Sequence, residues 1–94
     1  MISRQQVADA LKQLGDTPDK IAAYLMDHGI TGKPGDGLGC PIRNFIAAQF
    51  PNNDVGVCSD MIDIDKQYFA TNPAVENFID DFDGGFYPEL AETP

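Results

Sequence analysis

Glycine and proline divide this chain into short segments, and this division limits the length of every helix or strand. Nine glycines and seven prolines occur among 94 residues. Between them, apolar residues recur at helical spacing in some segments and alternate with polar residues in others. The chain is therefore expected to form short helices and strands joined by tight turns, packed around one modest core.

The first two segments predict an αα-hairpin with a very short connection. Ser3 followed by Gln6 forms the pattern of a capping box, and helical apolar spacing continues until Gly15. Thr17 and Pro18 then supply an N-cap and a first helical residue for the second helix. We expect these helices to cover residues 4–14 and 18–28.

The middle of the chain changes from helical to alternating apolar spacing. A glycine-rich loop is expected at residues 29–39, and Pro41 then begins a third helix at about residues 41–50. Alternation on both sides of a polar turn predicts a β-hairpin at about residues 54–65. Its outer face would carry Asp63 and Asp65.

The last helix is expected at about residues 73–83, after an Asn72 cap and before two glycines. Beyond it, three apolar residues are expected to fold back onto the core, and the final residues to fray. These are Phe86, Tyr87 and Leu90. The predicted class is a single α+β domain over residues 1–94, small and mainly helical: an αα-hairpin, a third helix, a β-hairpin and a C-terminal helix.

The charge of the chain is divided unevenly between its two halves. Residues 1–50 carry five acidic and five basic side chains, which cancel. Residues 51–94 carry ten acids and one base, Lys66, and so account for the whole net charge of −9. Such a half repels nucleic acid phosphates and attracts basic protein surfaces or cations. Direct binding to DNA or RNA is therefore not expected.

The expected C-terminal helix breaks two electrostatic rules. Glu76, Asp80 and Asp83 recur on one face, with Asp81 nearby, and like charges at this spacing repel. The three aspartates also lie toward the helix C-terminus, where the macrodipole disfavours anions. One interpretation is a merely solvated face; the other is a surface retained for partner binding. The candidate partner-binding residues are Asp63, Asp65, Glu76, Asp80, Asp81 and Asp83.

Catalytic chemistry has a weak basis in this sequence. Cys40 precedes a predicted helix, where the dipole lowers the pKa of a thiol, and His28 is a conceivable base. No third catalytic member and no oxyanion donor can be placed. A phosphate-binding loop at Gly32-Lys33 is not expected either, because Pro34 stands where the motif requires a hydroxyl residue. We therefore expect no enzymatic activity and no catalytic residue.

Residues 81–92 partly match a calcium-binding loop. Acids occupy positions 1, 3, 9 and 12, but Phe86 stands at position 6, where an EF-hand requires glycine. Cation binding stays open as an alternative function, although no metal site and no cofactor are expected.

Two blocks of the sequence resemble a group of small proteins from actinobacteria and their phages, a group with no established activity. The first block runs from Gly29-Ile30-Thr31-Gly32 through Gly35-Asp36 to Cys40-Pro41. The second includes Phe82-Asp83 and Tyr87-Pro88. The resemblance implies an actinobacterial cytoplasm or an infecting phage as the setting, and it carries over no catalytic residue.

The sequence therefore favours a small acidic protein-interaction module that binds and modulates a host protein with a basic surface. A cytoplasmic location without membrane association is expected, because the chain has neither a signal peptide pattern nor an apolar run that could span a bilayer. A DNA mimic that inhibits a DNA-binding protein is an alternative, and a cysteine-based enzyme is another. No feature of the sequence indicates an oligomeric state.

Overall fold

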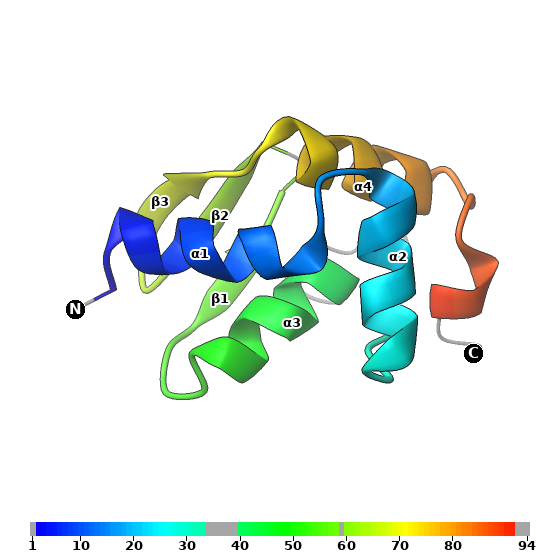
Figure 1. Cartoon of the computed structure of the whole chain (residues 1–94). Helices are drawn as coiled ribbons and strands as arrows, with labels where there is room; N and C mark the ends of the chain where they lie inside the picture. The colour runs from blue at the N-terminus through cyan, green and yellow to red at the C-terminus, as the bar shows by residue number, and fades with distance from the viewer. Residues whose placement is uncertain (1, 34–39, 59, 92–94) are drawn as a thin grey trace.

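The computed structural model describes residues 2–33, 40–58 and 60–91, and it confirms the α+β class (Figure 1). Four α-helices and a three-stranded antiparallel sheet make up this part of the chain, with a short 3₁₀-helix, η1, near its end. The elements are α1 (Arg4–Leu14), α2 (Pro18–Asp27), α3 (Pro41–Gln49), β1 (Val55–Val57), β2 (Met61–Ile64), β3 (Gln67–Ala70), α4 (Pro73–Asp83) and η1 (Pro88–Leu90).

Local capping explains where the first two helices begin. Ser3 Oγ accepts a hydrogen bond from Gln6 N at 3.2 Å, and Ser3 N donates to Gln6 Oε1 at 2.7 Å. These two bonds complete the predicted capping box. Thr17 Oγ1 likewise accepts from Lys20 N at 3.2 Å, as predicted for the N-cap of α2. Short-range hydrogen bonds that can be predicted from the sequence therefore fix where both helices of the αα-hairpin begin.

The predicted hairpin of β1 and β2 is confirmed, with Val55 opposite Ile64 and Val57 opposite Ile62. A third strand, β3, was not predicted from the sequence and pairs with β2 on its other side. The turn between β2 and β3 is formed by Asp65 and Lys66, both with positive φ values, 52° and 70°. Turns of this kind usually contain glycine, so the pattern carried no turn signal.

Asp65 therefore lies in a turn and not on the outer face of the hairpin, where the sequence placed it. Asp63 does lie on β2, on the face opposite the buried Ile62 and Ile64. The register extends this outer face to Tyr68, which is 67% exposed. The helices pack on the inner face, where α1 crosses in front of the strands in Figure 1.

The apolar stripe of α4 belongs to the same core as the inner face of the sheet. It consists of Val75, Phe78, Ile79 and Phe82, all at most 3% exposed. After α4 the chain folds back as predicted for Leu90, which is buried, and for Tyr87, whose ring stacks on Phe78 at 5.2 Å. The expectation for Phe86 is wrong, because this side chain is 71% exposed. Gly85, with φ of 90°, follows the helix end and turns the chain away there.

Candidate functional site

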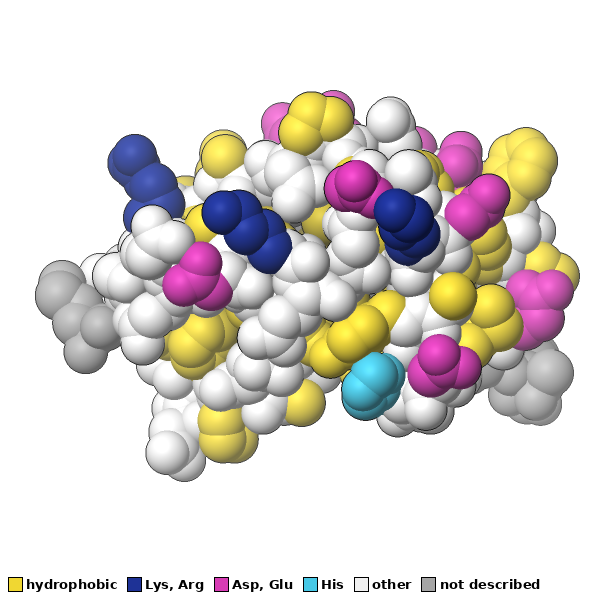
Figure 2. Space-filling view, viewed as in Figure 1, with side chains coloured by type: hydrophobic (Ala, Val, Ile, Leu, Met, Phe, Trp, Pro, Cys, Tyr) yellow, Lys and Arg dark blue, Asp and Glu magenta, His cyan; other side chains and the backbone are white. Residues whose placement is uncertain are grey.

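The solvent-facing side of α4 presents acidic side chains opposite a buried apolar stripe. Glu76 and Asp80 are exposed and lie one turn apart. Asp83 is exposed one turn further along, whereas Asp81 is half-buried on the flank of the helix that faces Tyr87. Acidic side chains lie along the upper edge of the molecule over α4 in Figure 2. We call Glu76 and Asp80 the acidic pair of α4.

No ion pair within residues 2–33, 40–58 and 60–91 involves this acidic pair. The ion pair found there joins Lys20 to Asp16 at 3.0 Å, at the start of α2. The sequence of α4 contains no lysine or arginine. Repulsion between Glu76 and Asp80, and between Asp80 and the helix dipole, is therefore opposed by no ion pair from the described residues.

The other candidate acids, Asp63 and Asp65, have local structural roles. Asp65 accepts hydrogen bonds from the Asn53 side chain and from Asp54 N, and the bond from Asn53, followed by the one from Asp54, lowers the pKa of its carboxyl. Asp63 Oδ1 accepts from Lys66 N at 2.8 Å across the turn. Both acids stabilise the turn between β2 and β3. The structure therefore separates the six candidate residues into a turn group and the α4 group.

Cys40 does not have the environment of an activated nucleophile. It is 3% exposed, and burial raises the pKa of its thiol, although backbone N–H groups of Ile42 and Arg43 act in the opposite direction. The expectation that the helix dipole would lower this pKa is therefore wrong, because desolvation of the thiolate has the larger effect. The geometry gives the cysteine-based alternative no support.

His28 caps the C-terminus of α2, as its position in the sequence indicated. Its Nδ1 lies 2.8 Å from Tyr24 O, and its ring stacks on the Tyr24 ring at a centroid distance of 4.0 Å. These contacts give His28 a structural role at the end of α2.

The part of the chain that the structure describes contains no preformed metal site. No group of three or more His, Cys, Asp or Glu side chains is arranged there to hold a metal ion. Glu92 of the calcium-loop pattern lies outside the described residues, as do the final residues expected to fray and the glycine-loop residues 34–39. In the described residues, no helix is long and apolar enough to cross a membrane.

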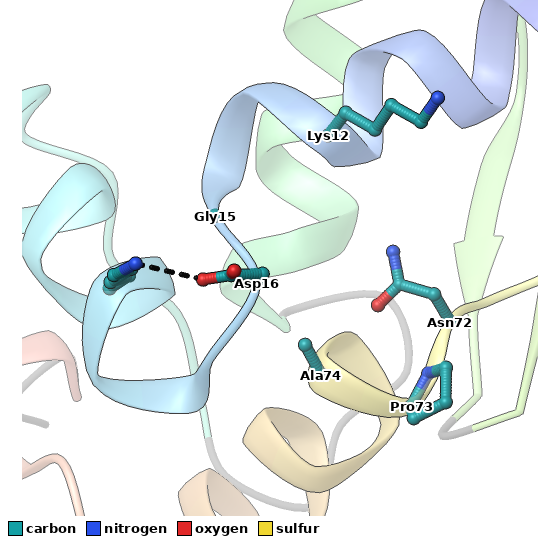
Figure 3. A pocket seen from close by; sticks show the side chains of 7 residues that line it. Lys12, Gly15, Asp16, Asn72, Pro73 and Ala74 are labelled. Carbon is teal, nitrogen blue, oxygen red and sulfur yellow. Dashed lines mark hydrogen bonds and ion pairs between the residues drawn. The ribbon is translucent and has the colours of Figure 1, made fainter.

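A groove that was not predicted from the sequence lies between α1 and β3. Arg4 and Lys12 line it on the helix side, and its volume is about 390 Å³. An adjoining hollow of about 620 Å³ shares Lys12 and Asn72 with this groove and extends to Lys20. Figure 3 shows this hollow, with the Lys20–Asp16 ion pair on one side and the Lys12 side chain, which forms no ion pair with a described residue, on the other. Lysine and arginine side chains are visible over α1 and α2 in Figure 2.

Comparisons with protein-family models, with curated proteins and with solved structures find no match for this chain. Two surfaces of the described residues are therefore the candidates for a functional site: an acidic helix face on α4 and a basic groove beside β3.

Proposed function

We propose that this protein is a small non-enzymatic interaction module that binds a basic surface of a partner protein through the acidic face of α4. The sequence resembles small proteins of actinobacteria and their phages, and in that setting the partner would be a host protein. The observation that carries this proposal is the acidic pair Glu76 and Asp80, exposed and without an ion pair among the described residues.

The energetics of α4 support binding as the reason for this arrangement. Asp80 stands four residues after Glu76 and in the last turns of a helix that lacks cations. A cationic group from a partner would relieve both the pairwise repulsion and the unfavourable interaction with the helix dipole. Electrostatic attraction of this type mainly increases the association rate and the specificity for one partner, and it weakens as the salt concentration rises.

The rigid support of the helix also favours a recognition surface. Phe78 and Phe82 are almost fully buried beneath the acidic face, and Asn72 Oδ1 caps the helix by accepting from Val75 N at 2.9 Å. The carboxylates are therefore presented from a helix fixed at its N-terminus and along its inner side. Little ordering of the protein would be required on binding.

The proposal is tested by affinity capture from an actinobacterial lysate, with mass spectrometry to quantify each retained protein. The test variant is the double charge reversal Glu76→Lys/Asp80→Lys. The control is Asp9→Lys/Asp27→Lys, which makes the same change in net charge at exposed positions on α1 and α2.

We expect the wild type and the control to retain at least one basic protein. The α4 variant should retain at least tenfold less of that protein. Its retention should also fall when the salt concentration rises from about 50 to about 300 mM, because salt screens the attraction between exposed charges. Equal retention by the two variants would show that the α4 face is not the binding surface.

A further inference from the structure

β3 forms one edge of the sheet, because the strand order is β1-β2-β3. Thr71 N donates to Asp60 O at 3.3 Å, just beyond the end of the β2–β3 ladder. Hydrogen-bonded and non-hydrogen-bonded positions alternate in an antiparallel pair. It follows that the N–H and C=O groups of Tyr68 and Ala70 point away from β2. Among the described residues, neither of these two takes part in a hydrogen bond outside the sheet.

The groove between α1 and β3 runs along this edge. Residues 68–72 all line it, one after another. A strand that turned one face toward the groove would contribute alternate residues, so the backbone edge itself forms this wall. On the opposite wall, α1 contributes the apolar Val7 and Leu11 together with the cationic Arg4 and Lys12.

The groove is basic in a protein whose net charge is −9. No acidic residue lines it, and no ion pair of the described residues uses Arg4 or Lys12. An unpaired strand edge accepts any extended chain through its backbone. The two cations then select a chain with acidic side chains on the face that is turned toward α1.

We infer that this groove binds an extended acidic segment of a partner protein, which adds to β3 as a fourth strand. Backbone hydrogen bonds to Tyr68 and Ala70 hold the segment, and its acidic side chains reach Arg4 and Lys12. Neither Glu76 nor Asp80 lines this groove, and the inference does not depend on the function proposed above.

The spacing of the two cations specifies the pattern of the segment. Arg4 and Lys12 are eight residues apart on α1, a rise of about 12 Å. In an extended chain, two residues on the same face and four positions apart are about 13 Å apart. Lys12 and Asn72 meet again in the adjoining hollow, so α1 and β3 advance along the groove in the same direction. The segment should therefore carry acids at positions i and i+4.

The test titrates the whole protein with a capped synthetic peptide, Thr-Glu-Val-Thr-Val-Glu-Val-Thr. Binding is measured by two-dimensional amide NMR and by hydrogen exchange. We expect saturable binding in which the Tyr68 and Ala70 amides exchange at least tenfold more slowly. Arg4→Glu/Lys12→Glu should weaken binding at least tenfold. Lys33→Glu/Lys66→Glu, with the same charge change at exposed positions outside the groove, should leave it within twofold.

A second variant tests the strand edge. Ala70→Pro removes an outward N–H and leaves the hydrogen bonds to β2 intact, so it should weaken peptide binding while the melting temperature stays near that of the wild type. The inference is overturned if the peptide does not bind at millimolar concentration, or if a version with lysine in place of glutamate binds equally. It is also overturned if binding leaves both amides unprotected, or if the protein alone is dimeric with these amides already protected, because the occupant is then a second copy.

Discussion

The Tyr87 hydroxyl donates a hydrogen bond to Asp19 Oδ1 at 2.9 Å and so joins residues that are 68 positions apart. This bond holds the segment after α4 against the start of α2. Two further contacts secure the same segment: the Tyr87 ring stacks on Phe78, and Gly32 N donates to Leu90 O at 2.9 Å. The acidic half of the chain is thus folded onto the neutral half and is not an appended tail.

The Tyr87–Asp19 contact predicts an unusual alkaline titration. Burial, followed by the hydrogen bond to Asp19, raises the pKa of Tyr87 to about 12, compared with about 10 for an ordinary tyrosine. The folded state therefore keeps a proton that the unfolded state has lost between these pH values. The stability contributed by this contact should be complete below pH of about 10 and should disappear as the pH rises toward about 12.

The measurement is an ultraviolet titration of phenolate formation in the wild type and in Tyr87→Phe. The difference between the two curves should have its midpoint near pH 12. A midpoint near 10, that of an unperturbed tyrosine, would contradict the contact.

Two glycines should differ in how they tolerate alanine. Gly15 has φ 125° and ψ 175°, and a Cβ atom there would lie 2.7 Å from Lys20 Cβ. Gly29 has φ 67°, and no described atom lies within 4 Å of a Cβ at that position. Gly15→Ala should therefore cost at least about 2 kcal/mol of unfolding free energy, and Gly29→Ala about 1 kcal/mol. Urea unfolding of both variants measures this order, and the reverse order would be inconsistent with the turn after α1.

Lys66 is strained in the turn between β2 and β3, because its φ is 70°. Lys66→Gly should relieve this strain and form an Asp-Gly turn that favours hairpins. The expected gain is roughly 0.5–1 kcal/mol, since about 1–2 kcal/mol of strain is relieved and part of it is offset by the entropy of glycine. Lys66→Ala removes the same charge but keeps Cβ, so it should show no such gain in thermal unfolding. Equal effects of the two variants would assign the change to charge.

The two cysteines should react very differently with a chromogenic thiol reagent. Cys58 is exposed and Cys40 is buried, with its thiol pKa raised by that burial. One thiol should react in the native protein and both in denaturant, and Cys58→Ser should abolish the native reaction. Rapid labelling of Cys40 in the native protein would instead indicate an accessible, activated thiol and would support the alternative of a cysteine-based enzyme.

The sequence predicted the helices well because their boundaries depend on short-range chemistry. Thr17 and Asn72 cap through hydrogen bonds to residues three positions later, which a linear pattern reveals directly. β3 was missed because Asp65 and Lys66 form its turn without glycine, and their left-handed conformation is stabilised by hydrogen bonds to Asp65 from Asn53 and Asp54.

The candidate surfaces were predictable only in part, for a similar reason. The acidic pair of α4 lies within one helix, so its helical spacing placed it correctly on the exposed face. The basic groove combines Arg4 and Lys12 with an edge strand about 60 residues later, and no local pattern reports that proximity. The burial of Cys40 likewise depends on packing between distant segments.

The single substitution Asp80→Lys tests the central claim most directly, because it separates stability from binding. It removes the repulsion with Glu76, creates a favourable Glu–Lys pair at i and i+4, and places a cation near the helix C-terminus. Together these changes should stabilise the fold by roughly 1 kcal/mol, which raises the melting temperature by about 4–8 °C in a domain of this size. We predict that Asp80→Lys melts higher than the wild type and retains at least tenfold less of the captured partner. A lower melting temperature, or unchanged retention of the partner, would contradict the account.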